Sequence, residues 1–416
     1  LDQLASQSAR FVNGYVPTSV CSPSLATLLT GLYPHQHGIH YNHPPPGNSA
    51  FNKMISRSRY EDVRSKGFEL IRSQPTLPRV LAEQGYRCLQ TGKFWEGHYS
   101  NAGFTDGMTR FQPVPRQEFG GNRKLASGES AAHGNGDWGL KIGRETMQPL
   151  FDFVDQCGSD QPFLIWYAPY LPHEPHNSPK RFTDLYQGDQ NVPEHRRAYY
   201  ASCSEFDDTV GQLVNYIEKK GLAEDTLFVF VVDNGWTPGD KRSKRGNFQH
   251  TKESKRSPFE DGLRTPILLR WDGVISPKEQ TGLCSSVDLV PTILDALGLS
   301  CRMDSLPGSS LMPASKGEGA WSNQTVFGEI YPGDASVLGD PSKDVAYRWI
   351  RDGDLKLIVS HPEDGETAWG NYLKGDALFD LAADPGETNN VINGSKHKKR
   401  LSAMRKQLDQ WWSLKK

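Results

Sequence analysis

The sequence predicts an α/β protein with a largely parallel sheet flanked by helices, followed by a small C-terminal α+β domain. Strand-like apolar runs alternate with helix-like segments through most of the 416 residues, which is the pattern of a parallel sheet. Two runs, Pro162–Ala168 and Thr226–Val232, are almost continuously apolar, as expected of strands buried on both faces. After Leu306 the chain becomes rich in Pro, Gly and Ser, and the short strand-like segments that follow suit a small antiparallel sheet.

The first segment, Leu1–Val16, is interpreted as a helix whose pattern is already under way at Leu1, with Leu1, Leu4 and Ala5 on one face. Because the chain starts there without an initiator methionine, we expect the natural N-terminus to lie upstream. The length suits one large and one smaller domain, and the change in composition places the boundary near residue 318. The predicted domains are therefore residues 1–318 and 319–416.

The other elements follow from hydrophobic period and end signals. A short helix is predicted between Thr76, a plausible cap, and Gly85, a plausible stop. Apolar residues recur at helical spacing from Tyr199 to Ile217, which predicts a long helix between two strands. The remaining predicted strands are Tyr86–Gln90, Thr265–Trp271, Gln324–Ile330, Tyr347–Ser360 and Ala377–Leu381, and the remaining predicted helices are Ser286–Leu299 and Lys396–Leu414.

Composition excludes several classes of protein. The formal net charge is -2, so no overall field indicates a nucleic-acid partner. No apolar run approaches the length of a membrane span. Six cysteines are present, and setting Cys21 aside leaves an odd number, which does not indicate a disulfide framework.

Five polar residues follow predicted strands, namely Lys93, His173, Asp233, Asn234 and Lys255. In open parallel sheets ligands bind beyond the carboxyl ends of the strands, so these side chains are predicted to share one edge. Adjacent acid and amide oxygens suit a hard cation, and lysines with a histidine around it would suit a tetrahedral oxyanion. Taken singly, each residue is more often a turn or a solvated surface group.

Cys21 lies directly before a predicted helix. Ser22 is a good N-cap, Pro23 a good first helical residue, and Gly31 a good stop. A helix N-terminus stabilises anions and lowers the pKa of a thiol, so Cys21 is a candidate reactive centre. The alternative is an ordinary buried core cysteine.

These motifs together resemble the type I sulfatases of the alkaline-phosphatase superfamily, over almost the whole chain. The blocks that carry the resemblance are Cys21-Ser22-Pro23-Ser24-Leu25 with Thr30-Gly31, Gly92-Lys93-Phe94-Trp95-Glu96-Gly97, Pro172-His173-Glu174-Pro175, Asp233-Asn234-Gly235, Lys255 with Glu260-Asp261-Gly262-Leu263-Arg264-Thr265-Pro266, and the late segment Leu378–Asn390. The resemblance implies the alkaline-phosphatase-like fold and hydrolysis of sulfuric esters of a sulfated carbohydrate or an aryl sulfate.

The resemblance also implies a nucleophile and a metal. In the family the signature cysteine, here Cys21, is oxidised by a maturation enzyme to formylglycine, whose hydrate attacks sulfur and then expels sulfate. A calcium ion, with magnesium as the alternative, polarises the sulfate oxygens. By carry-over, the metal ligands are Asp233, Asn234 and the modified Cys21.

The remaining roles carry over to three residues. Lys93 and Lys255 would bind sulfate and neutralise developing charge, and His173 would contact the leaving oxygen as the general-acid candidate. Two positions depart from the family pattern: Leu25 stands where the family has arginine, and Trp95 where it has histidine. His98 is close enough in sequence to Trp95 to be a further substrate-binding candidate.

The family begins with an apolar strand ending in paired aspartates that complete the metal site, and this chain starts after that point. Two alternative functions stay open: phosphoester or phosphonate hydrolysis by the same kind of site, and a catalytically impaired protein that only binds polyanions. The resemblance further implies a periplasmic or extracellular location, a sulfated small molecule or glycan as partner, and no nucleic acid.

Overall fold

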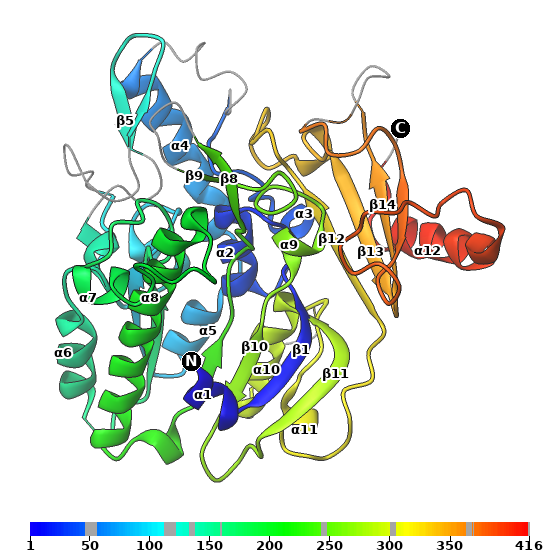
Figure 1. The fold of residues 1–416 in the computed structure, drawn as a ribbon. Coiled ribbons are helices and arrows are strands. Elements are labelled where there is room, and N and C mark those ends of the chain that lie inside the picture. Colours follow the sequence, from blue (N-terminus) through cyan, green and yellow to red (C-terminus); the bar gives the residue numbers. More distant parts are fainter. Residues whose placement is uncertain are drawn as a thin grey trace. The chain divides into compact units, whose positions relative to one another are not determined.

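The structure is a computed structural model that describes residues 1–45, 56–111, 122–132, 138–158, 160–242, 248–299, 305–362, 368 and 370–414. The chain forms two compact units. Unit 1 comprises Leu1–Gln3, Ala50–Leu227 and Pro238–His250, and unit 2 comprises Leu4–Ser49, Phe228–Thr237 and Thr251–Lys416. Each unit has its own sheet structure (Figure 1).

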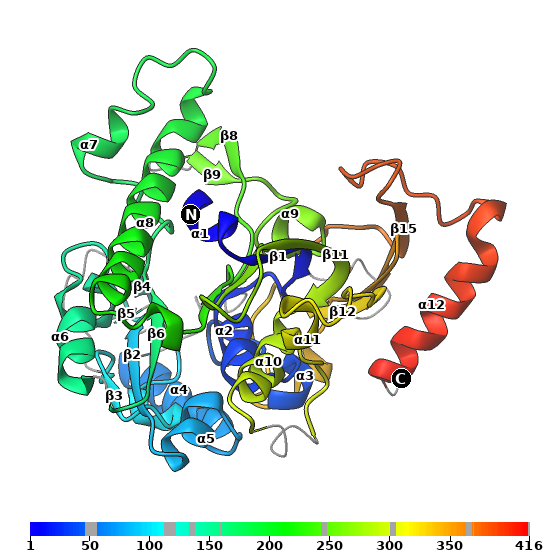
Figure 2. The same cartoon turned by 90° about the horizontal axis from the view of Figure 1, so that it is seen from below.

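Unit 1 is built on a parallel three-stranded sheet in the order β3-β2-β6, whose strands are labelled in Figure 2. Strand β2 (Arg87–Gly92) pairs in parallel with β3 (Asp106–Gly107) and, along its whole length, with β6 (Phe163–Ala168). Helices α6 (Gln148–Cys157) and α8 (Glu194–Lys219) flank the sheet. The core between them contains Leu89, Ile142, Met147, Leu150, Phe153 and Cys157, with Leu213 packed against it.

The first sheet of unit 2 has four strands in the order β11-β1-β10-β7. Strand β1 (Ala9–Tyr15) is parallel to β11 (Lys278–Ser285) and antiparallel to β10 (Ile267–Arg270), and β10 is antiparallel to β7 (Phe228–Phe230). Helices α2 (Cys21–Thr30) and α10 (Leu289–Ala296) of this unit lie next to each other (Figure 2).

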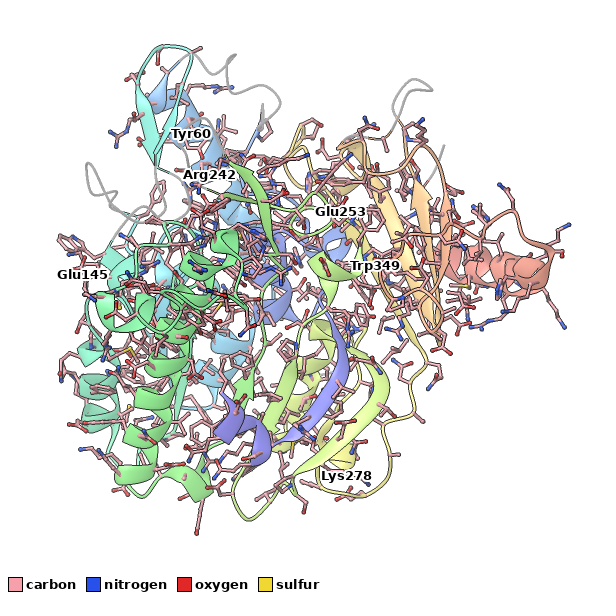
Figure 3. The ribbon with its side chains drawn as sticks, viewed as in Figure 1. Tyr60, Glu145, Arg242, Glu253, Lys278 and Trp349 are labelled. Atoms are coloured by element: carbon pink, nitrogen blue, oxygen red, sulfur yellow. The ribbon has the colours of Figure 1, made fainter. Side chains whose placement is uncertain are left out.

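The second sheet of unit 2 is an antiparallel meander of four strands, β12 (Thr325–Ile330), β13 (Tyr347–Asp352), β14 (Leu355–Ser360) and β15 (Ala377–Asp380). Helix α12 (Lys398–Trp411) covers one face, where its Met404 and Leu408 join Ile350, Leu357 and Leu378 in one core (Figure 2). The opposite face packs against β1, with Trp349, labelled in Figure 3, 5.6 Å from Tyr15 between ring centroids.

Shorter elements complete the chain. The other α-helices are α1 (Asp2–Ser6), α3 (Pro34–His37), α4 (Arg57–Arg72), α5 (Leu77–Glu83), α7 (Lys180–Thr183), α9 (Glu260–Leu263) and α11 (Met312–Ser315). The other strands are β4 (Asn122–Lys124) with β5 (Ser130–Ala132), and β8 (Pro238–Arg242) with β9 (Phe248–His250), each pair a hairpin. Within the described ranges, no helix has the length and apolar character needed to cross a membrane.

The α/β class and the C-terminal antiparallel sheet with its closing helix are confirmed. The predicted N-terminal helix is wrong beyond Ser6, because residues 9–15 form β1, which pairs with β11 and β10 and in which buried Ala9 and Phe11 alternate with exposed Arg10 and Val12. The strand predicted over Thr265–Trp271 is present as β10 but runs antiparallel to both neighbours. A domain boundary at residue 318 stays a prediction.

The two continuous apolar runs are strands, but neither is fully buried. Every residue of β6 and of β7 is half-buried. Within its own unit, each strand has one partner among the described residues, β2 for β6 and β10 for β7. Continuous hydrophobicity indicated the strands correctly but overstated their burial.

Candidate active site

Cys21 is the first residue of α2 and is buried, with 2% of its surface exposed. Val20, in extended conformation, takes the N-cap position without a side-chain hydrogen bond, so the prediction that Ser22 caps the helix is wrong. A residue outside the helix satisfies one of its first N–H groups instead: the Ser22 backbone N–H donates to Oδ1 of Asn42 at 2.9 Å. Gly31 ends the helix as predicted, in the left-handed conformation with φ 69°.

Within unit 2 the structure brings Cys21 against the predicted metal ligands. The Cys21 Sγ donates to Oδ1 of Asn234 at 3.4 Å. Asn234 is buried and Asp233 beside it is half-buried, in the loop that follows β7. The Asn234 amide also donates to the Gly235 carbonyl oxygen at 3.1 Å, which fixes which way the amide faces. A reactive group at position 21 would therefore lie next to oxygen ligands.

The loop that carries Lys255 is tied to the segment before Cys21. The Arg256 N–H donates to the carbonyl oxygen of Ser19 at 3.0 Å, and the Ser19 hydroxyl donates to the carbonyl oxygen of Ser257 at 2.7 Å. Arg256 adopts φ 72°, which is uncommon for a residue with a side chain. These bonds hold the backbone next to Lys255 close to the start of α2, and the Lys255 side chain is half-buried.

Two residues that support this arrangement were missed by sequence reasoning. Asp334, in the loop after β12, is buried and accepts through Oδ1 from the backbone N–H groups of Asn42 at 2.7 Å and His43 at 3.2 Å. Its carboxylate also lies 3.7 Å from the Arg256 guanidinium. Asn42 and Asp334 are 292 residues apart, and no local pattern marks either of them, so only the fold could reveal this support.

Within unit 1, Lys93 and His173 follow neighbouring parallel strands. The last residues of β2 and β6, Gly92 and Ala168, are register partners, and the Lys93 N–H donates to the Ala168 carbonyl oxygen at 2.5 Å. Gly92 has φ 76°, and a Cβ there would lie 1.8 Å from that same oxygen, so glycine is required before Lys93. The two candidates therefore share one edge of this sheet, and both are half-buried.

The loop that carries His173 is held by a buried arginine that sequence reasoning missed. The Arg144 guanidinium donates to the carbonyl oxygen of His173 at 3.4 Å and of Pro175 at 2.8 Å. It pairs with Glu205 of α8 at 3.6 Å, where both side chains are at most 5% exposed. The His173 ring packs 4.6 Å from Tyr170 between centroids, and its Nδ1 lies 3.0 Å from the Glu174 carbonyl oxygen.

His98 and Trp95 have local roles in unit 1. Nδ1 of His98 lies 2.8 Å from the Ser100 hydroxyl and accepts from the Ser100 N–H, so it caps the short turn that follows. Only Nε2 of His98 is then available for a substrate. Trp95 is buried, with the Arg64 guanidinium 5.8 Å from its ring centroid.

The donor set on unit 2 fits a hard cation in kind but not in number. Asp233 and Asn234 supply carboxylate and amide oxygens, whereas calcium takes about 6–8 oxygen ligands. Among the residues that the structure describes, no three histidine, cysteine, aspartate or glutamate side chains gather as a metal site. Any metal bound here would need further oxygens beyond Asp233 and Asn234.

Two family models match this chain. The sulfatase model matches residues 1–299, and the model described as N-sulphoglucosamine sulphohydrolase, C-terminal, matches residues 249–413. The two matches together extend across both units.

Individual proteins agree with the family models. Human arylsulfatase A is 28% identical over 426 residues, covering 95% of this chain and 78% of that protein. Human N-acetylgalactosamine-6-sulfatase is 24% identical over 417 residues, covering 93% of this chain and 75% of that protein. A solved structure from a study of glycosaminoglycan metabolism by Bacteroides thetaiotaomicron superposes with a TM-score of 0.68 at 19% identity, covering 99% of this chain and 93% of the other. That last likeness supports the fold.

Proposed function

Because this chain belongs to the sulfatase family, we propose that it hydrolyses sulfate esters of glycans or aryl sulfates with a nucleophile derived from Cys21. The observation that carries the proposal is the hydrogen bond from Cys21 at the start of α2 to Asn234 at 3.4 Å. Formylglycine hydrated to its geminal diol at this position would supply one hydroxyl to attack sulfur and displace the alcohol, and a second whose deprotonation would expel sulfate and restore the aldehyde. A hydroxyl there could donate to the same Asn234 oxygen that now accepts from the thiol.

The chain's own residues bind and stabilise the ester. Lys255 is held near the start of α2 by the hydrogen bonds of Ser19 with the backbone of Arg256 and Ser257, and its ammonium would neutralise charge that grows on the sulfate oxygens. Lys93 would do the same from the end of β2. His173, whose Nδ1 lies next to the Glu174 carbonyl oxygen, would use Nε2 to donate a proton to the leaving oxygen.

Calcium, with magnesium as the alternative, would polarise the sulfate oxygens if bound. Asp233 and Asn234 are the residues that would hold it, together with the modified side chain at position 21. The maturation enzyme that forms formylglycine would be a transient partner, and a periplasmic or extracellular location would suit a sulfated glycan substrate.

Phosphoester or phosphonate hydrolysis is the alternative from the same superfamily, and the sulfatase family model and the sulfatase relatives favour sulfate instead. A protein that binds polyanions without turnover is the other alternative. Both are distinguished by assay with paired aryl sulfate and aryl phosphate substrates.

The proposal is tested by mass spectrometry of the peptide that contains Cys21, purified from an active preparation made in the native host. At least partial conversion to formylglycine is expected, and Cys21→Ala should abolish sulfate-ester turnover. Cys88→Ala is a matched control, because Cys88 is a buried thiol on β2. A wholly unmodified Cys21 in an active protein would contradict the mechanism, and turnover of phosphate but not sulfate esters would contradict the substrate class.

A further inference from the structure

The short helix α9 contacts three separate segments of unit 2 through its backbone. Its Gly262 carbonyl oxygen accepts from the Gly235 N–H at 2.9 Å. A Cβ on Gly262 would lie 2.3 Å from the Ser254 carbonyl oxygen and 3.1 Å from Cβ of Ser19. A Cβ on Gly235 would lie 1.9 Å from the carbonyl oxygen of Asp261. The backbone of α9 is in direct contact with these segments, and no side chain fits between them. A shift of α9 would therefore shift these segments too.

Each of these segments carries a candidate site residue. Asn234 precedes Gly235, Lys255 follows Ser254, and Cys21 lies two residues after Ser19. A displacement of α9 would therefore change the positions of Cys21, Asn234 and Lys255 relative to one another. The geometry of the site depends on what holds α9.

What holds α9 is a buried cluster of charges at its first residue. The Glu260 carboxylate accepts from Lys356 Nζ at 2.9 Å and from the Tyr15 hydroxyl at 2.6 Å, and lies 3.7 Å from Arg351. Lys356 Nζ also pairs with Glu387 at 2.9 Å, and Glu387 in turn accepts from the Glu260 N–H at 2.5 Å. Both cations come from the C-terminal sheet, Arg351 on β13 and Lys356 on β14.

The cluster is buried except at its edge, where a third cation, the half-exposed Arg264, lies 3.9 Å from the Glu260 carboxylate. Lys356 is fully buried, and the side chains of Glu387, Arg351 and Glu260 are 3%, 10% and 12% exposed. Burial by itself raises the pKa of Glu260, but Lys356, Tyr15 and Arg351 outweigh it and hold the pKa below its ordinary value. Glu260 is therefore ionised, and burial together with the neighbouring Glu260 charge raises the pKa of Glu387. Two cations and two carboxylates make a clamp that is costly to break from one side.

We propose that Glu260, clamped by Lys356 and Glu387 of the C-terminal sheet, is a positioning residue that keeps α9 in place as the common support of Cys21, Asn234 and Lys255. The expected effect of this support on catalysis rests on the proposed function. It assigns the C-terminal sheet a role in the geometry of the site, in addition to its role in folding.

The test compares Lys356→Met with Arg348→Met. Arg348 is a buried cation of the same sheet, but its guanidinium binds Asp409 at 3.0 Å and the Leu408 carbonyl oxygen at 3.3 Å, both on α12. Both variants should lower the melting temperature. Only Lys356→Met should speed hydrogen exchange in the peptide containing Gly235, whose N–H is bonded to α9, and only it should lower kcat for an aryl sulfate, by about tenfold or more, with little change in KM. Lys356→Arg should restore both.

Equal exchange and equal kcat in the two methionine variants, after matching for melting temperature, would overturn the proposal. So would unchanged exchange near Gly235 in Lys356→Met. If Lys356→Met does not fold, the double variant Lys356→Met with Glu387→Gln removes one charge of each sign and is judged by the same two readouts. Exchange needs no turnover, so a wild-type protein without sulfatase activity would refute the proposed function while the exchange comparison still decides the positioning role.

Discussion

Replacing Gly262 with alanine should disable the site without unfolding the protein. Gly262 lies in α9, and its φ is outside the left-handed region, so alanine meets no backbone strain of its own. The added Cβ would instead lie 2.3 Å from the Ser254 carbonyl oxygen and 3.1 Å from Cβ of Ser19. The nearer atom belongs to the backbone, which cannot rotate away as a side chain would.

The required movement sets the expected size of the effect. An ordinary carbon–oxygen contact is about 3.3 Å, so the two backbones must separate by about 1 Å. A misplacement of about 1 Å at a site can lower the rate about 100-fold, which corresponds to about 2.7 kcal/mol of transition-state stabilisation. The folding free energy should fall by about 1–3 kcal/mol, as for other overpacked cores.

The assay is turnover of an aryl sulfate by the mature protein, alongside urea unfolding of wild type and variant. Gly211→Ala is the matched control, because Gly211 lies within α8 and a Cβ there would meet no atom within 4 Å. That control should keep full activity and gain about 0.5–1 kcal/mol of stability. Wild-type kcat/KM in a fully folded Gly262→Ala protein would refute the reasoning, because the alanine Cβ would overlap the Ser254 carbonyl oxygen unless the backbone moved.

Three further predictions follow from the site and its surroundings. Lys255→Ala and His173→Ala should each lower kcat more than they raise KM, by about 2.7–4 kcal/mol of transition-state stabilisation, and an unchanged kcat for both would mean that the pocket lies elsewhere. Calorimetry should show calcium binding weaker than micromolar, because Asp233 and Asn234 supply two of the about 6–8 oxygens that calcium takes, whereas micromolar affinity would require other carboxylates. Burial lowers the pKa of His37 from 6.5 to about 3. As the pH falls below 6.5, His37 is protonated in the unfolded chain but stays neutral in the folded chain. The free energy of unfolding, measured with urea, should therefore fall by about 2 kcal/mol between pH 7 and pH 5 because of this group. His37→Gln should make that decrease smaller.

Local pattern was sufficient for the elements and for the polar residues at their ends. Parallel pairing of β2 with β6 places the residues after Gly92 and Ala168 at one edge, which is why Lys93 and His173 could be placed together from sequence. Pro23 and Gly31 likewise predicted α2, since a proline in the first turn and a glycine stop are local signals.

The number of partners that a strand has within its unit was not available from local pattern. The apolar segment of β6 has the composition of a central strand, yet it has a single partner among the described strands of its unit, and its residues are half-buried. Hydrophobicity reports what a strand can bury, whereas the number of neighbours decides what it does bury.

The sequence by itself determined that a helix ending at Gly31 starts close to Cys21, that Asp233 and Asn234 follow an apolar strand, and that Lys255 lies in a later loop. The structure moved the start of that helix onto Cys21 itself. Only the tertiary structure decided what holds these residues in place. Lys356, which in a strand would ordinarily face solvent, is fully buried because Glu260 and Glu387, 96 and 31 positions away, meet it inside the C-terminal sheet's contact with α9. A buried charge is tolerated only where partners from distant parts of the chain converge on it, and that convergence is a property of the fold.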